Sequence, residues 1–76
     1  MEPTVLDATG LLCPLPVLKA RKALKAMAAG EVLRVLATDK GAVKDFEAFC
    51  RTTGNELVEH SEADGTFVFM IRKSGA

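Results

Sequence analysis

The chain has 76 residues, of which 49% are hydrophobic, and its ten basic residues balance its ten acidic residues. This length suits one small domain with a modest core, so we expect residues 1–76 to form a single domain. The balanced charge argues against nucleic-acid binding driven by bulk charge. No apolar run approaches the roughly 20 residues of a membrane span. Nothing resembles a signal peptide, because Asp7 follows the first apolar residues, Val5 and Leu6. We therefore expect a cytoplasmic protein that does not act at a membrane.

A short strand and a helix are the first elements that the pattern predicts. Residues 4–7 are typical of a strand, and residues 16–27 carry apolar side chains at the spacing of an amphipathic helix. The residues on that apolar face are Val17, Ala20, Leu24 and Met27. Gly30 is placed to stop the helix.

Three strands and a second helix follow. Residues 31–38 predict a strand, after which Asp39 is expected to cap a helix that ends at Gly54, a residue type that tolerates a left-handed turn. The buried stripe of that helix is predicted to contain Val43, Phe46, Phe49, Cys50 and Thr53. Residues 56–61 and 66–73 predict two further strands, joined by a hairpin with Asp64-Gly65 in its turn.

The order βαβαββ predicts an α+β fold, a two-layer α/β sandwich. Because a helical crossover between neighbouring parallel strands is right-handed in nearly all proteins, both helices should cover one face of a mixed four-stranded sheet. The opposite face would meet solvent or a partner. We expect Val32, Leu36, Val58 and Met70 on that outer face.

Cys13 lies in the run Gly-Leu-Leu-Cys-Pro-Leu-Pro, directly before the first predicted helix. Pro14 and Pro16 have φ angles close to the helical value and cost little where the amides are unpaired, while Gly10 allows the preceding loop to fold back. The amides and the positive dipole at a helix start stabilise a thiolate, so we expect a lowered pKa and a reactive Cys13.

The second cysteine and the histidine are predicted to have structural roles. Cys50 falls on a buried helix face and His60 on a strand, remote in sequence from Cys13. No general base for Cys13 is evident. Two cysteines and one histidine without metal-ligand spacing predict no metal site.

The exposed side of the first helix combines basic and apolar residues. Its cations are Lys19, Arg21, Lys22 and Lys25, and Leu15 and Leu18 point to the same side. Such a face is most simply a solvated surface. Alternatively, it docks acidic patches of partner proteins and speeds their encounter with Cys13.

Several motifs resemble the TusA/SirA family of small sulfur-carrier proteins, and the resemblance covers nearly the whole chain. They are Leu6-Asp7-Ala8, Gly10-Leu11, the core Cys13-Pro14-x-Pro16 with Arg21-Lys22, then Phe49-Cys50, Asn55-Glu56-Leu57-Val58 and Ile71-Arg72-Lys73. The later motifs resemble the TusA branch. Many TusA-like proteins have an acidic residue between the two prolines, where this chain has Leu15.

The resemblance implies a function and its partners. In that family the cysteine accepts sulfane sulfur from a cysteine desulfurase, holds it as a persulfide and passes it to an acceptor protein, in the TusA branch for 2-thiolation of the tRNA wobble uridine. The same branch has links to molybdenum-cofactor synthesis and sulfur oxidation. For this chain it implies Cys13 as the sulfur-carrying residue, no cofactor beyond the transient persulfide and no direct tRNA binding. A carrier that meets successive partners would work well as a monomer.

Two other function classes stay open from the residues alone. A redox protein would use Cys13 and Cys50 together, and needs their Cα atoms within about 7 Å. A regulatory or RNA-binding module would use the basic helix, although the chain has no Tyr or Trp and its four Phe residues fall mostly on predicted core faces.

Overall fold

A computed structural model describes residues 3–75 of the chain; residues 1, 2 and 76 of the expected domain lie outside the described residues. Four strands and two helices follow one another as β1 (Thr4–Ala8), α1 (Leu15–Lys25), β2 (Val32–Ala37), α2 (Ala42–Thr53), β3 (Glu56–Ala63) and β4 (Thr66–Arg72). None of the helices in this range is both long enough and apolar enough to span a membrane.

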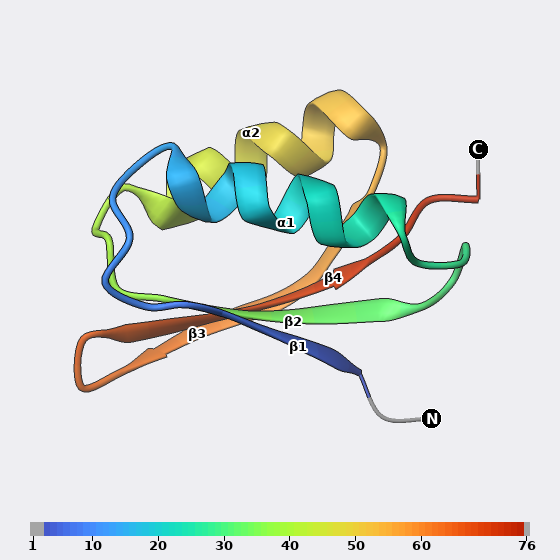
Figure 1. Cartoon of the computed structure of the whole chain (residues 1–76). Helices are drawn as coiled ribbons and strands as arrows, with labels where there is room; N and C mark the ends of the chain where they lie inside the picture. Colours follow the sequence, from blue (N-terminus) through green and yellow to red (C-terminus); the bar gives the residue numbers. More distant parts are fainter. Residues whose placement is uncertain (1–2, 76) are drawn as a thin grey trace.

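The strands form one mixed sheet in the order β1-β2-β4-β3. β1 pairs with β2 in parallel, whereas β4 is antiparallel to both β2 and β3. Both helices cover the same face of this sheet, α1 over β1 and β2, and α2 over β3 and β4 (Figure 1). The predicted α+β sandwich is therefore confirmed.

Local backbone requirements explain the turns. The β3–β4 hairpin has a two-residue turn in which Asp64 and Gly65 both have positive φ, 52° and 80°, as a type I′ turn requires. At the end of α2, Gly54 adopts the left-handed conformation, and its N–H donates to the Cys50 carbonyl at 2.9 Å. Both turns were predicted from the sequence.

The core lies between the helices and the sheet. Its largest fully buried side chains are Phe46, Phe69, Leu33, Ile71 and Val35. The rings of Phe46 on α2 and Phe69 on β4 lie with centroids 4.6 Å apart. On α1 the buried residues are Pro16, Ala20 and Leu24. An aromatic pair thus packs α2 against the sheet, and smaller side chains pack α1 against it.

Three details of the predicted elements are wrong. α1 ends at Lys25 instead of Met27, with Ala26 as C-cap, and Gly30 lies beyond it. Asp39 does not cap α2, because the helix begins after Gly41 without a side-chain cap. Thr53 is exposed, since Ala42, Phe46 and Cys50 form the buried stripe of α2.

The sheet face opposite the helices carries side chains of intermediate burial. Val32, Leu36 and Met70 are partly buried, and Val58, at an irregularity in the β3–β4 pairing, is 43% exposed. Met70 is not fully covered, and its partners in the sheet are the exposed Arg34 and Glu59, so charged side chains flank it on this face.

Replacement of Ile71 by Val tests the core assignment. Ile71 is fully buried, and the loss of one methylene there should reduce the free energy of unfolding by about 0.5–1.5 kcal/mol. Val58→Ala, at an exposed position of the neighbouring strand, serves as the control and should change it by less than about 0.5 kcal/mol. Urea unfolding of both variants measures this; equal losses would contradict the assignment.

Candidate functional site

Hydrogen bonds at Thr9 and Gly10 connect the loop that carries Cys13 to residues at the ends of β1 and β2. The Asp7 carboxylate accepts hydrogen bonds from the Thr9 N–H at 3.0 Å and the Thr9 hydroxyl at 2.6 Å. Gly10 has a φ of 80°, which favours glycine, and its N–H donates to the Thr38 hydroxyl at 2.8 Å. The end of β2 therefore holds the loop that follows β1.

The helix after Cys13 begins with its first amides already engaged. Pro14 is the N-cap of α1, and the Cys13–Pro14 peptide bond is cis. The Leu15 N–H donates to the Leu12 carbonyl at 2.9 Å, and Pro16, the next residue, has no N–H. The Cys13 thiol is exposed. Neither Leu15 nor Pro16, at the start of α1, has a free backbone N–H that could donate a hydrogen bond to it.

Two carboxylates lie beside the thiol, that of Asp39 in the loop before α2 and that of Asp45 in its first turn. The Cys13 Sγ and one carboxylate oxygen each of Asp39 and Asp45 lie within 4.8 Å of one another. The thiol donates a hydrogen bond to Asp45, and this bond, with smaller contributions from desolvation and from the charges of Asp45 and Asp39, raises the pKa of Cys13 above its ordinary value. The lowered pKa expected from the helix start is therefore wrong for the free protein.

The same three residues are the group in the described chain that could hold a metal ion, since each offers one ligand atom. A thiolate with two carboxylates is a mixed ligand set, and Zn²⁺ accepts both ligand types. The sequence spacing did not predict this grouping.

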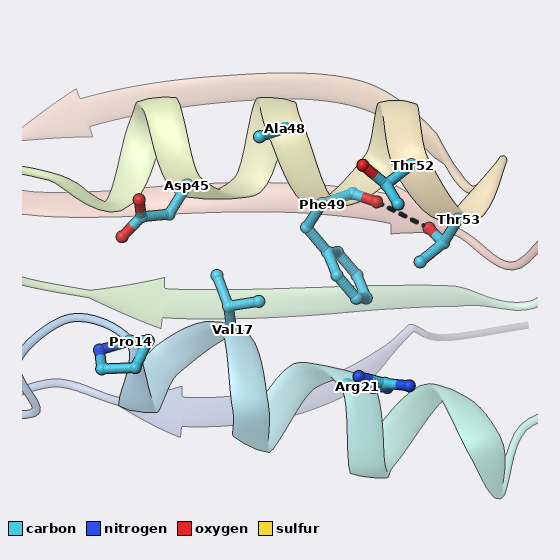
Figure 2. A pocket seen from close by; sticks show the side chains of 8 residues that line it. All are labelled: Pro14, Val17, Arg21, Asp45, Ala48, Phe49, Thr52 and Thr53. Atoms are coloured by element: carbon cyan, nitrogen blue, oxygen red, sulfur yellow. Dashed lines mark hydrogen bonds between the residues drawn. The ribbon is translucent and has the colours of Figure 1, made fainter.

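A groove of about 390 Å³ runs from this site between the two helices (Figure 2). Its lining residues are Pro14, Val17 and Arg21 of the α1 side and Asp45, Ala48, Phe49, Thr52 and Thr53 of α2. Figure 2 shows Asp45 near the Pro14 end, while Arg21 lies further along α1. The groove thus has an acidic end next to Cys13, an apolar middle and a basic residue beyond it.

The side of α1 directed to solvent has the predicted exposure. Lys19, Arg21, Lys22 and Lys25 are exposed, and Leu15 and Leu18 are about half exposed, at 47% and 51%. Leu12, in the loop before Cys13, is more exposed still at 69%. An apolar surface therefore borders the thiol, and the cations extend from it along the helix.

Cys50 and His60 lie apart from this surface. Cys50 is 5% exposed within the core, and burial raises the pKa of its thiol to about 11. His60 is an exposed residue of β3 whose ring lies 6.1 Å from that of Phe69. A buried thiol with so high a pKa is a poor nucleophile at neutral pH.

Comparison with known proteins assigns the chain to a family. The family model for sulfurtransferase TusA matches residues 4–73, which is nearly the whole chain. The chain belongs to the TusA family. The two relatives described next match this chain over nearly their whole length.

Two curated relatives illustrate the similarity. The chain is 61% identical to the sulfur carrier protein TusA of Allochromatium vinosum, over 91% of either protein. It is 57% identical to a putative sulfur carrier protein of Neisseria meningitidis, over 95% of this chain and 97% of the relative.

A solved structure supports the fold. The SirA-like protein from Desulfitobacterium hafniense superimposes with a TM-score of 0.81 at 30% sequence identity, covering 93% of this chain and 97% of that one. A SirA-like protein with 30% sequence identity therefore has the same sandwich fold.

Asp39 and Asp45 are the site residues that sequence reasoning missed. Asp39 was assigned to a helix cap and Asp45 was given no role, because both lie far from Cys13 in the sequence. The signal that could have found them is topological. The first turns of two helices on the same face of a sheet, each following a parallel strand, lie at the same sheet edge.

The two cysteines should differ strongly in reactivity towards a soluble thiol reagent. In the native protein only Cys13 should react within minutes, and Cys50 should become available after unfolding in urea, because it is buried in the core. Mass-spectrometric counting of labels before and after unfolding measures this. Two fast labels in the folded protein would contradict the placement of Cys50.

Proposed function

We propose that this protein is a sulfur carrier that accepts sulfane sulfur as a persulfide on Cys13 and passes it to an acceptor protein. The observation that supports this most strongly is the exposed thiol in the Cys-Pro-x-Pro turn of a TusA-family chain, whereas the second cysteine is buried. The thiol belongs to a short loop held by the sheet and lies beside an accessible groove.

The transfer step balances without an external oxidant. The Cys13 thiolate attacks the outer sulfur of the donor persulfide, a bond forms between Sγ and that sulfur, and the donor's own sulfur–sulfur bond breaks. The donor cysteine leaves as a thiolate and takes up a proton, to replace the one that Cys13 gave up. One thiol and one persulfide thus become one persulfide and one thiol, and the reverse chemistry delivers the sulfur to an acceptor cysteine.

The partners that suit this role are proteins. We propose a cysteine desulfurase as donor and a downstream sulfur-relay protein as acceptor, with 2-thiolation of the tRNA wobble uridine as the pathway served. The carrier acts in the cytoplasm as a monomer, needs no cofactor beyond the persulfide and does not bind tRNA directly. Leu12, Leu15 and Leu18 around Cys13 offer an apolar contact, and the α1 cations offer attraction to acidic partner surfaces.

The alternative as a two-cysteine redox protein has less support. It requires Cys50 to reach Cys13, and Cys50 is on the buried face of α2 with a pKa of about 11. Binding of single-stranded RNA would need exposed aromatic platforms, and of the four Phe residues two are fully buried and two, Phe49 and Phe67, are partly buried.

Sulfur loading tests the proposed function directly. After incubation with a cysteine desulfurase and free cysteine, the wild-type protein should gain the mass of one sulfur atom, and a reductant should remove it. Cys13→Ser should gain nothing, whereas Cys50→Ala should load like the wild type. Failure of the wild type to load from the desulfurase, and also from thiosulfate and polysulfide, would overturn the proposal.

The α1 cations are expected to speed the encounter with the donor. Lys22→Gln together with Lys25→Gln should slow loading from a desulfurase by on the order of tenfold at low ionic strength, and the deficit should shrink in high salt because the attraction is screened. The matched control removes two exposed cations of α2, by Lys44→Gln and Arg51→Gln. Stopped-flow or quenched loading measures the rates; equal effects of the two pairs would exclude a docking role specific to α1.

A further inference from the structure

The groove between the helices (Figure 2) continues into a second cavity at its far end. This cavity has a volume of about 190 Å³. Three lining residues belong to both the groove and the cavity: Arg21, Phe49 and Thr53. The two therefore form one extended groove along α1 and α2. Its near end is lined by Asp45, the hydrogen-bond partner of Cys13, and its far end by Lys73, which follows β4.

The two ends of the extended groove carry opposite charges. The Asp45 carboxylate lines the near end, whereas the described lining of the far cavity contains three cations and no carboxylate. These cations are Arg21, Lys25 and Lys73. No carboxylate among residues 3–75 forms a salt bridge with any of them, since the ion pair found in this range joins Arg72 to Glu56. The far end is therefore a cationic cavity that lacks an internal counter-ion.

Lys73 is the most firmly positioned of the three cations. Arg21 and Lys25 are exposed, but Lys73 is partly buried, and its Nζ donates a hydrogen bond to the Met27 carbonyl just beyond α1. Its backbone N–H also donates to the Glu31 carbonyl at 2.9 Å. Because an ammonium group has three donors, two remain for a ligand in the cavity.

The length of the extended groove limits what can occupy it. A helix rises about 1.5 Å per residue, so Arg21 lies about 10 Å and Lys25 about 16 Å along α1 from its N-cap, Pro14. A single amino acid such as cysteine is too short to join the two ends, because one extended residue spans at most about 3.6 Å. A ligand with its sulfur at Cys13 and an anion among the cations needs a long arm between them.

The lining between the two ends suits an uncharged arm. Val17 of α1 and Phe49 of α2 are partly buried apolar side chains, and Ala48 lies beside them in the lining. The Thr52 hydroxyl adds one polar group. Apolar walls with a few placed polar groups are typical of sites for small molecules. An arm of alkyl and amide groups matches this surface, and a charged arm does not.

We propose that the extended groove binds a low-molecular-weight persulfide whose sulfur is carried on a pantetheine-type arm that ends in phosphate. A phosphate has a charge of about −1.5 to −2 at pH 7, so it matches a cavity with three cations better than one carboxylate does. Asp45 repels the phosphate at the other end, which leaves the sulfur beside Cys13. Such a persulfide is a further class of sulfur donor, and this role rests on the proposed function.

Transfer from such a donor balances in the same way as transfer from a protein. The Cys13 thiolate attacks the outer sulfur of the persulfide, a bond forms between Sγ and that sulfur, and the donor's sulfur–sulfur bond breaks. The pantetheine sulfur leaves as a thiolate and takes up a proton, which replaces the one that Cys13 gave up. No oxidant or reductant is consumed.

Binding of 4′-phosphopantetheine and of pantetheine, which differ only in the phosphate, tests the site. Titrations are followed by the amide NMR signals of Cys13→Ser, so that no covalent chemistry intervenes. The phosphorylated compound should bind about tenfold more tightly, with shifts along the groove at Val17, Phe49 and Asn55. Equal affinities would overturn the inference. Shifts caused by a short acidic peptide, but not by phosphopantetheine, would also overturn it and would indicate a protein segment as the occupant.

A matched pair of double variants shows whether the far cavity holds the phosphate. Arg21→Gln with Lys25→Gln should remove the preference for the phosphorylated compound. The control is Arg51→Gln with Lys44→Gln, which also removes one exposed arginine and one exposed lysine, but from positions of α2 outside the described lining. It should keep the preference. Thermal unfolding confirms that both variants are folded, and equal losses of preference would overturn the inference.

Sulfur loading from the persulfides of the same two compounds tests the donor role. At concentrations well below saturation, wild-type Cys13 should load about tenfold faster from the phosphorylated persulfide. Equal loading rates from the two persulfides, in a protein that loads normally from a desulfurase, would overturn the inference alone. Absence of loading from every donor would instead overturn the proposed function, and the binding preference measured on Cys13→Ser would still stand.

Discussion

The packing of both helices on one face of the sheet is the constraint on which the site depends. The Phe46 and Phe69 rings, with centroids 4.6 Å apart, fix α2 over β4, and the fully buried Ala20 seats α1 over the neighbouring strands. β1 and β2 are parallel and each leads into a helix, so both helices start at the same edge of the sheet (Figure 1). Cys13 before α1 and the acidic residues at the start of α2 meet there.

This arrangement gives the cysteine an environment that its sequence neighbours alone do not predict. The Cys-Pro-x-Pro turn exposes the thiol and starts a helix beneath it, which by itself favours a thiolate. The first turn of α2 and the loop before it bring Asp45 and Asp39 to the same place, and their effect raises the pKa of Cys13. The prolines contribute to that outcome, since Pro16 lacks one of the donors that would stabilise a thiolate. Position on a helix is therefore an incomplete guide to cysteine reactivity.

The sequence was sufficient for the features that depend on local or periodic signals. Asp64-Gly65 predicted the hairpin, Gly54 predicted the end of α2, and the alternation of elements predicted a mixed sheet with both helices on one side. It was insufficient where contacts between residues distant in the sequence determine the position of a side chain. Asp39 has the side chain of a helix cap, yet Gly41 is the N-cap of α2 and the Asp39 carboxylate lies near Cys13. Thr53 fits the helical stripe, but the last turn of α2 leaves it exposed.

The open face of the sheet and the groove between the helices offer two separate surfaces to partners. The groove adjoins Cys13 through Pro14 and Asp45, so under the proposed function it is the surface nearest to the transferred sulfur. Mapping the position of the transferred sulfur tests the central claim most directly. A loaded protein is alkylated, digested and sequenced by mass spectrometry. The account predicts the additional sulfur on the peptide that contains Cys13, and none on the peptide that contains Cys50. Sulfur found on Cys50, or lost on unfolding without any covalent adduct, would contradict it.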